Sequence, residues 1–375
     1  VMALPSMLRG QNTYVPDNNF EQALIDLGHD TALDDFVLTA NISGVTSLDV
    51  NAKEISDLTG IEGFTALTEL YCHVNELTSL DVSSNTELQY LSCGNNELTA
   101  LDVSSNTALL NLNCENNQLT SLDVSANTAL TILRCNENSL TNLDVSSNTA
   151  LTGLYCQQNQ LTSLDVSNNT ALDNFSCEVN LLTSLDVSAN TALVELRCNN
   201  NQLIHLNMKN GVTDALTFYA TGNSFDCIEV NAEDVDYAAE NWTYANGNID
   251  EGVGFSVVCV PEGYTYVPDN NFEQALIDLG YDTALDDFVL TENINGVTSL
   301  DVNNKGISDL TGIEAFTALT GLWCYDNQLT TLNMSANTAL GSLHCYDNQL
   351  TSLDVSNNPA LSLLWCGQNQ LTSLD

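Results

Sequence analysis

Hydrophobic and polar positions recur along this chain with a fixed period of 21 residues. The period is clearest in the cysteines, which form two evenly spaced series. The first series is Cys72, Cys93, Cys114, Cys135, Cys156, Cys177 and Cys198, and the second is Cys324, Cys345 and Cys366. Around each cysteine the chain reads L-x-x-L-x-C-x-x-N-x-L, with Phe175 replacing the second leucine once. A fixed period between about 20 and 50 residues predicts a solenoid of stacked repeats.

Apolar and polar residues alternate in the segment that leads to each cysteine. Because successive side chains of a strand face opposite ways, we expect Leu70 and Cys72 inside and Tyr71 outside. No single repeat can bury its apolar side alone, but stacked neighbours share one continuous core. The asparagine three residues after each cysteine, Asn75 in the first copy, stands where the chain leaves the strand. We expect its amide to satisfy backbone groups of adjacent turns.

The other half of each repeat is nearly constant and reads T-S-L-D-V-S-x-N-T-A-L. Leu80 and Val82 alternate with polar residues there, which predicts a second short strand. A 21-residue repeat with two strand-like segments and two turns leaves little room for helix.

The repeated pattern resembles the leucine-rich-repeat consensus L-x-x-L-x-L-x-x-N-x-L, with cysteine at the third apolar site. Its short form is similar to the solenoids of surface proteins from flavobacteria-like organisms of marine and gut habitats. The resemblance implies a leucine-rich-repeat solenoid, rich in parallel strands with little helix outside its caps. It also implies a recognition scaffold, of a kind often exported with a C-terminal sorting domain.

A whole module is duplicated, because residues 13–70 and 265–322 match at 51 of 58 positions. Each copy begins T-Y-V-P-D-N-N-F-E-Q-A-L-I-D-L-G, in which Asn18 and Glu21 have the spacing of a capping box. An apolar stripe follows, and Gly28 is a candidate C-cap. This pattern predicts a helical cap that covers the first open strand edge. The segment after it looks like the opening repeats of internalin-type proteins.

The first series ends near Phe225, and Cys227 and Cys259 bracket the irregular stretch that follows. We interpret these two cysteines as a disulfide that staples a C-terminal cap, which implies an oxidising, extracytoplasmic setting. The seven cysteines of the first series are expected to be buried core residues, and their odd number prevents complete pairing.

Two tandem modules with N-terminal helical caps therefore make up the expected organisation. The second module stops in mid-repeat, so we expect the natural protein to continue. The expected segments are a leader or linker remnant (1–12), an N-terminal helical cap and opening repeat (13–66), leucine-rich repeats (67–225), the disulfide-stapled cap (226–260), a linker (261–264), a second cap and opening repeat (265–318) and the repeats of the second module (319–375).

The net charge of the chain limits the classes of partner that it can bind. The chain has 49 acidic residues against 6 Lys and Arg, a formal net charge of −43. Such a field repels phosphate backbones, which excludes nucleic acid as a partner. It is compatible with divalent cations or with basic protein surfaces. No stretch approaches the roughly 18 apolar residues of a membrane helix, so we expect no membrane-spanning segment in this chain.

Catalytic motifs are absent from the sequence: there is no G-x-S-x-G, H-E-x-x-H, Walker loop or dinucleotide fingerprint. We therefore predict no catalytic residues, no enzymatic activity and no required cofactor. One polar pattern, Asp81-x-Ser83-x-Asn85, resembles the start of a calcium loop but lacks the glycine and terminal glutamate of an EF-hand. Local hydrogen bonds and turns are the simpler interpretation. The weaker calcium candidates are Asp81, Asp102, Asp123, Asp144, Asp165 and Asp186.

The outward strand positions differ in every repeat, whereas the other half barely changes. A recognition surface needs such variation, and a scaffold does not. In the second module these positions become aromatic, which is typical of an interaction patch. The alternative is that aromatic residues simply suit strand surfaces. The candidate ligand-binding residues on this concave face are Trp323, Tyr325, His344, Tyr346, Trp365, Tyr71, Tyr90, Arg134, Tyr155 and Arg197.

The sequence thus favours a non-enzymatic, extracellular or cell-surface adhesion protein that binds a protein or peptide through its strand face. Two alternatives stay open. A glycan-binding module would stack sugar rings on the aromatic residues of the second module. A structural stalk would need a uniform face, which this chain lacks.

Overall fold

The computed structural model describes residues 11–211 and 216–374. The chain divides into two compact units, Val1–Cys259 and Val260–Asp375. Of the expected leader at 1–12, residues 1–10 lie outside the described residues, and Asn12 already belongs to the first strand. None of the helices in the described ranges is long and apolar enough to cross a membrane.

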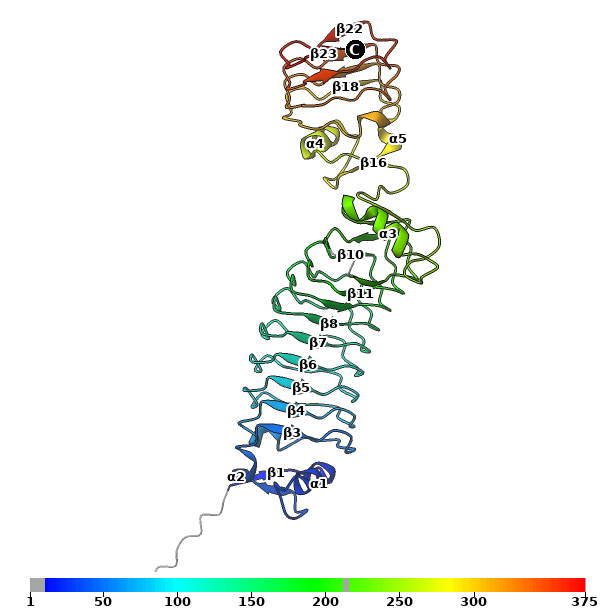
Figure 1. Cartoon of the computed structure of the whole chain (residues 1–375). Coiled ribbons are helices and arrows are strands. Elements are labelled where there is room, and N and C mark those ends of the chain that lie inside the picture. Colours follow the sequence, from blue (N-terminus) through cyan, green and yellow to red (C-terminus); the bar gives the residue numbers. More distant parts are fainter. Residues whose placement is uncertain (1–10, 212–215, 375) are drawn as a thin grey trace, which may run out of the picture. The chain divides into compact units, whose positions relative to one another are not determined.

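The first unit opens with a helical cap at one end of its solenoid (Figure 1). Two strands of the cap pair in antiparallel fashion, and a helix lies between them. The elements are β1 (Asn12–Tyr14), α1 (Asn18–Asp26), β2 (Phe36–Leu38) and α2 (Thr39–Ile42).

Asp17, and not Asn18, is the N-cap of α1, which corrects the expected capping box. Its Oδ1 accepts hydrogen bonds from the amides of Asn19 and Phe20, both at 2.9 Å. Its Oδ2 accepts bonds from the amide and hydroxyl of Ser56, so one carboxylate ties the helix to the first repeat. Gly28 follows the helix with a φ of +81°, the left-handed conformation that glycine adopts without strain.

A nine-stranded parallel sheet forms one side of the first solenoid, in the order β13-β11-β9-β8-β7-β6-β5-β4-β3. Equivalent residues of successive repeats lie directly opposite one another, as in the pairing of Leu91 with Leu70 and Leu112. The predicted leucine-rich-repeat solenoid of parallel strands is confirmed. Its strands are β3 (Ser47–Asp49), β4 (Glu69–Tyr71), β5 (Tyr90–Ser92), β6 (Asn111–Asn113), β7 (Ile132–Arg134), β8 (Gly153–Tyr155), β9 (Asn174–Ser176), β11 (Glu195–Arg197) and β13 (Thr217–Tyr219), with a 3₁₀ turn, η1 (Ile61–Gly63), after β3.

The expected second strand of each repeat forms in only part of the described solenoid. Near β3 to β9 it is reduced to a bridge between Asp81 and Asp102. Inside–outside alternation persists nevertheless, with Leu80 and Val82 buried and Asp81 exposed. A four-stranded parallel sheet appears at the far end, made of β10 (Ser184–Asp186), β12 (His205–Asn207), β14 (Cys227–Glu229) and β15 (Gly254–Ser256).

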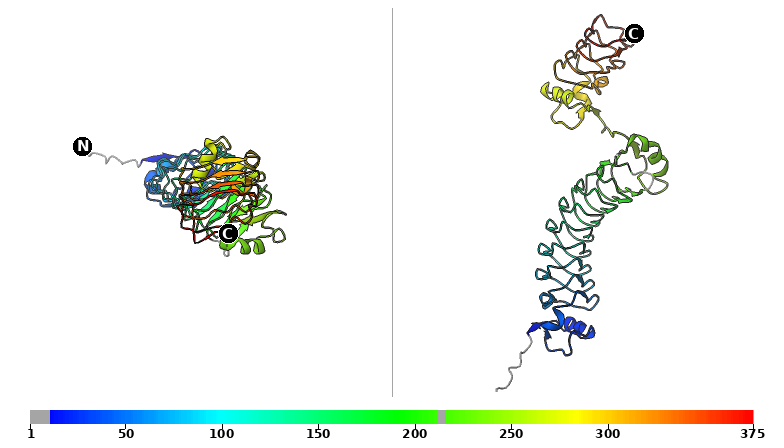
Figure 2. Two further views of the ribbon diagram at one scale, coloured as in Figure 1. Left: turned by 90° about the horizontal axis from the view of Figure 1, so that it is seen from above. Right: turned by 60° about the vertical axis from the view of Figure 1, so that its left-hand side comes forward.

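A C-terminal cap of different construction closes the first unit (Figures 1 and 2). It contains η2 (Ala232–Asp234) and α3 (Val235–Asn241). Cys227 and Cys259 form a disulfide, with their Cα atoms 5.6 Å apart. Trp242 packs on Phe218 of β13, an end strand of the nine-stranded sheet, with ring centroids 4.7 Å apart.

The second unit repeats the same plan. Its cap is followed by a four-stranded parallel sheet in the order β18-β19-β20-β22 and by a second pair, β21 with β23. The elements are β16 (Tyr264–Tyr266), α4 (Asn270–Asp278), β17 (Phe288–Leu290), α5 (Thr291–Ile294), β18 (Ser299–Asp301), η3 (Ile313–Ala315), β19 (Gly321–Trp323), β20 (Ser342–His344), β21 (Ser352–Leu353), β22 (Leu363–Trp365) and β23 (Ser373–Leu374).

Two ladders of asparagine run through the core beside the leucines and cysteines. In the first, Asn117 accepts a bond from the amide of Leu98 and donates to the carbonyls of Cys93 and Cys114. In the second, Asn127 is fully buried and donates to backbone carbonyls of the preceding repeat. The sequence predicted the first ladder, whereas the second was interpreted as turn residues. Both ladders fix each repeat to its neighbour.

Candidate recognition surface

Register places five side chains of the second unit in one group, which we call the aromatic cluster: Trp323, Tyr325, His344, Tyr346 and Trp365. Because β19, β20 and β22 pair in register, His344 lies opposite both Trp323 and Trp365. The ring centroids of Trp323 and His344 are 5.5 Å apart, and those of His344 and Trp365 are 5.0 Å apart. The predicted column of rings therefore forms in the structure.

Two tyrosines extend the cluster beyond the ends of these strands. Tyr325 and Tyr346 stack with centroids 4.6 Å apart and an interplanar angle of 7°. Trp365 lies 6.2 Å from Tyr346 and is 54% exposed, so the cluster reaches solvent. Desolvation, with a further contribution from Tyr325, raises the pKa of the Tyr346 hydroxyl above its usual value. This hydroxyl is therefore neutral near neutral pH and can donate a hydrogen bond.

Glycine before the first tryptophan makes room for its indole. A Cβ at Gly321 would lie 2.8 Å from Cη2 of Trp323. On β4, the equivalent strand of the first unit, Glu69 and Tyr71 occupy these two positions. The orientation of the Trp323 ring thus depends on a small neighbour, a requirement that the sequence pattern alone did not reveal.

On the first unit, the strand face carries two cation–aromatic pairs. The guanidinium carbon of Arg134 lies 4.8 Å from the ring centroid of Tyr155, and that of Arg197 lies 5.1 Å from Tyr219. Arg197 also forms an ion pair with Glu195, at 2.6 Å between Nε and Oε1. The hydrogen bond that Arg197 donates to Glu195 is the main reason why the pKa of Arg197 is raised.

A shallow depression of about 270 Å³ opens across β8, β9 and β11 beside these pairs. Polar and charged side chains dominate its lining, which consists of Tyr155, Gln157, Asn174, Phe175, Ser176, Glu178, Glu195 and Arg197. Tyr155 and Arg197 were predicted as ligand-binding residues, Glu178 and Glu195 were expected on this face without being named as candidates, and Tyr219 was missed. Tyr219 could have been found, since it directly precedes Ala220, which replaces the ladder cysteine.

The two remaining sequence candidates lie elsewhere on the same face. Tyr71 is half-buried on β4, and Tyr90 is 38% exposed on β5. Burial, followed by the charge of Glu69, raises the pKa of Tyr71. Both strands are separated from β7, which carries Arg134, so the face holds its candidates in separate groups.

The aspartate ladder does not assemble the pattern of a calcium loop. Asp81 Oδ1 accepts a hydrogen bond from the amide of Ser83 at 2.9 Å, which closes a local turn. Hydrogen bonds from Ser83 lower the pKa of Asp81. Asn85 is fully buried and donates inward to Ile61 and Phe64, so it does not face the same ligand space as Asp81. This geometry favours the simpler interpretation of local turns.

Carboxylates close enough to share a metal ion occur instead in the two helical caps. Within residues 11–211 and 216–374, two groups of three have ligand atoms within 4.8 Å of one another: Glu21, Asp30 and Asp34, and Glu273, Asp282 and Asp286. The sequence analysis did not predict these groups, because Glu21 was interpreted as part of a capping box.

Ladder cysteines are unsuited to chemistry on substrates. Nine of the ten free cysteines in the described residues are buried, and Cys366 is half-buried. Burial raises the pKa of Cys93 and of Cys345 to about 12. At such values the thiolate, which is the nucleophilic form, is scarcely populated near neutral pH.

Comparison with known proteins finds similar solved structures. The functional domain of InlJ from Listeria monocytogenes, described as including a cysteine ladder, is 30% identical and superposes with a TM-score of 0.54. That match covers 98% of this chain and 73% of the InlJ domain. An LRR protein of Leptospira interrogans has 19% identity and a TM-score of 0.46, over 90% of this chain and 88% of its own.

Sequence comparison finds the same relative. Internalin J of Listeria monocytogenes serotype 4b (strain F2365) is 37% identical over 75 residues. These residues are 20% of this chain, and they span only 8% of that internalin J. No protein-family model matches the sequence.

Proposed function

We propose, from the premise that this chain belongs to the internalin-like leucine-rich-repeat proteins, that it is a non-enzymatic, surface-exposed or secreted recognition protein. Its ligand is a protein or peptide, bound on the strand face. The observation that carries the proposal is the aromatic cluster, five contiguous rings that end in the half-exposed Trp365. Exposed aromatic patches mark interaction sites, and tryptophan and tyrosine dominate binding hot spots.

Ring geometry favours a protein or peptide over a glycan. Sugar rings stack on an open aromatic face, but Tyr325 and Tyr346 cover each other at 7°. Trp323 is likewise stacked against His344, at an angle of 24°. The cluster therefore presents ring edges and polar atoms more than free faces, which suits side chains and peptide groups.

The charge distribution supports the same proposal. Among only six Lys and Arg in this highly acidic chain, Arg134 and Arg197 both lie on the strand face. Each guanidinium lies against a tyrosine ring, and that of Arg197 is also paired with Glu195, whereas none of the salt bridges among the described residues involves Arg134. An acidic side chain of a partner would find a bidentate donor in Arg134, while most of the surface repels it.

The test is a binding screen of the intact chain against surface-protein and polysaccharide panels, with a Trp323→Ala, Trp365→Ala double variant beside it. Tyr244→Ala is the matched control, since Tyr244 is 63% exposed on the C-terminal cap of the first unit. For a hot spot of about 2 kcal/mol or more, the double variant should weaken a protein ligand about 30-fold or more. The control should bind as the natural chain does.

Other outcomes distinguish the alternatives. A polysaccharide ligand lost in the double variant would replace the protein ligand by a glycan. A protein ligand indifferent to both tryptophans but lost in Arg134→Ala, Arg197→Ala would move the site to the first unit. Absence of any ligand that responds to either pair would leave the stalk interpretation, and circular dichroism verifies that each variant is folded.

A further inference from the structure

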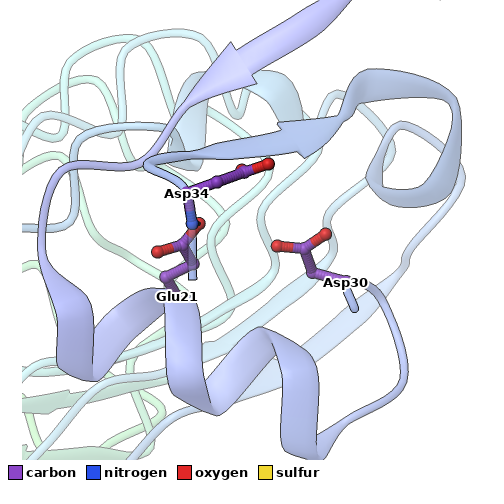
Figure 3. Close-up of side chains that lie close together, drawn as sticks. All are labelled: Glu21, Asp30 and Asp34. Carbon is purple, nitrogen blue, oxygen red and sulfur yellow. The ribbon is translucent and has the colours of Figure 1, made fainter. Parts of the chain in front are cut away.

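Three carboxylates converge inside each helical cap, away from the strand face. In the first unit Glu21 comes from α1, while Asp30 and Asp34 come from the loop between α1 and β2 (Figure 3). One ligand oxygen of each lies within 4.8 Å of the others. The second unit repeats the arrangement with Glu273, Asp282 and Asp286.

The glutamate of each group is buried and only half satisfied. Glu21 is 0% exposed, and its Oε1 accepts the amides of Asp34 at 2.8 Å and Phe36 at 3.2 Å. Its Oε2 is buried without a hydrogen-bond partner, as is Oδ2 of Asp30. Figure 3 shows the Glu21 carboxylate beside the backbone nitrogen of Asp34, with the Asp30 carboxylate across from it.

The second cap repeats the buried glutamate and both unpartnered oxygens. Glu273 is also 0% exposed, its Oε1 accepts the amide of Asp286 at 2.8 Å, and its Oε2 has no partner. Oδ2 of Asp282 is likewise buried without a partner.

Protein cations do not neutralise either group. The salt bridges among the described residues involve Glu195, Glu229 and Asp278, and none of them reaches the two triads. An unpaired buried carboxylate costs free energy, and three that converge repel one another. Something else must therefore balance the charge, either a bound cation or a proton.

We propose that each cap binds one divalent cation of the calcium type, held by the three carboxylates of its triad. Calcium binds carboxylate oxygens at about 2.3–2.6 Å, so two of its ligands lie at most about 5 Å apart, which accommodates the observed spread. Backbone carbonyls or water would complete the shell. Such an ion would join α1 to the loop that leads into β2 and so rigidify the cap over the end of the solenoid.

The first experiment is a calorimetric titration of the intact, chelator-treated chain with calcium chloride in about 0.1 M potassium chloride, which screens loose attraction to the acidic surface. We expect two equivalents for the natural chain, one for Glu21→Gln, and none for Glu21→Gln, Glu273→Gln. Glu97→Gln removes the same charge from an exposed position of the repeats and should retain both equivalents. Absence of saturable binding, or two equivalents in the double variant, would overturn the proposal.

Stability measurements separate a lost ligand from a damaged cap. Without calcium, Glu21→Gln should raise the melting temperature, because the amide keeps the acceptor Oε1 and replaces the unpaired Oε2 by a donor. With calcium, the same variant should lose half of the stabilisation that the natural chain gains. The double variant Asp34→Asn, Asp286→Asn is a second way to remove one ligand from each site without damaging the cap, since these exposed aspartates contribute little to packing. If a shared proton balances the charge instead, acid will stabilise the natural chain and calcium will not, which refutes a metal site.

Discussion

The two asparagine ladders should differ in their contribution to stability, in the order opposite to their burial. Asn127 is 0% exposed and Asn117 is 9% exposed. We predict that Asn117→Ala destabilises the solenoid by about 3 kcal/mol and Asn127→Ala by about 1 kcal/mol. The prediction depends on which backbone groups keep a partner after each substitution.

For Asn117, the decisive bond is the one that its Oδ1 accepts from the amide of Leu98 at 2.9 Å. Loss of this acceptor leaves a buried donor unpaired, at about 1–3 kcal/mol. The carbonyls of Cys93 and Cys114 lose one bond each but keep a second, from Asn96 and Asn138. These two losses add roughly 1 kcal/mol in total.

For Asn127, every partner remains satisfied without it. The carbonyl of Val103 still accepts the amide of Asn106, and the carbonyl of Asn106 still accepts the amide of Leu109. The substitution also removes Oδ1 of Asn127, a buried acceptor without a partner. This relief offsets part of the two lost bonds, while the cavity is the same as at Asn117.

The assay is urea unfolding of the intact chain, followed by far-ultraviolet circular dichroism, for each variant. Thr128→Ala is the control, because Thr128 is exposed beside Asn127 and should change the unfolding free energy by less than about 0.5 kcal/mol. The reasoning is refuted if Asn127→Ala costs as much as Asn117→Ala. Equal slopes against urea are required for the comparison.

Three further predictions test other features. Burial opposes ionisation of Asp17, but hydrogen bonds from Phe20 and Ser56 outweigh it and hold its pKa below 3.8, so the stabilisation by the ionised carboxylate is present above that pH and lost below it. Asp17→Asn should therefore lower the melting temperature near neutral pH but not in strong acid. Parallel plots of melting temperature against pH for the two chains would contradict this. Val179 has a φ of +56°, which strains a β-branched residue, so Val179→Asn should gain about 1 kcal/mol in urea unfolding while Val194→Asn should not. The buried thiols, with Cys93 at a pKa of about 12, should resist alkylation in the native chain and react in denaturant, as mass spectrometry can count.

Periodicity was sufficient to predict the solenoid, because each repeated position meets its own copy in the next turn. Leu70 and Cys72 recur at a fixed interval, and in-register pairing stacks them into one core. The disulfide between Cys227 and Cys259 could also be predicted, since these two cysteines stand outside the period. The aromatic cluster followed from the same register.

Residues whose partners lie outside their own repeat escaped prediction. Asn85 looks like a surface turn residue, yet its amide donates to Ile61 and Phe64 in the preceding turn. Glu21 looks like half of a capping box, but the cap belongs to Asp17, and Glu21 turns inward to Asp34. No local pattern distinguishes these polar residues from exposed ones, because only tertiary packing decides which of them is buried.

The two duplicated modules differ in sequence at one proposed site, the strand face, but not at the other, the carboxylate triad. All three outward positions along β4 differ from their counterparts along β19, where Glu69, Tyr71 and His73 are replaced by Gly321, Trp323 and Tyr325. Solvent exposure alone does not explain these replacements, because α1 and α4 are identical in sequence even at their exposed positions. The cap triads are also unchanged. A strand face whose outward positions all change, while the first cap helix and the carboxylate triad are kept, is expected of two modules that fold alike and bind different partner surfaces.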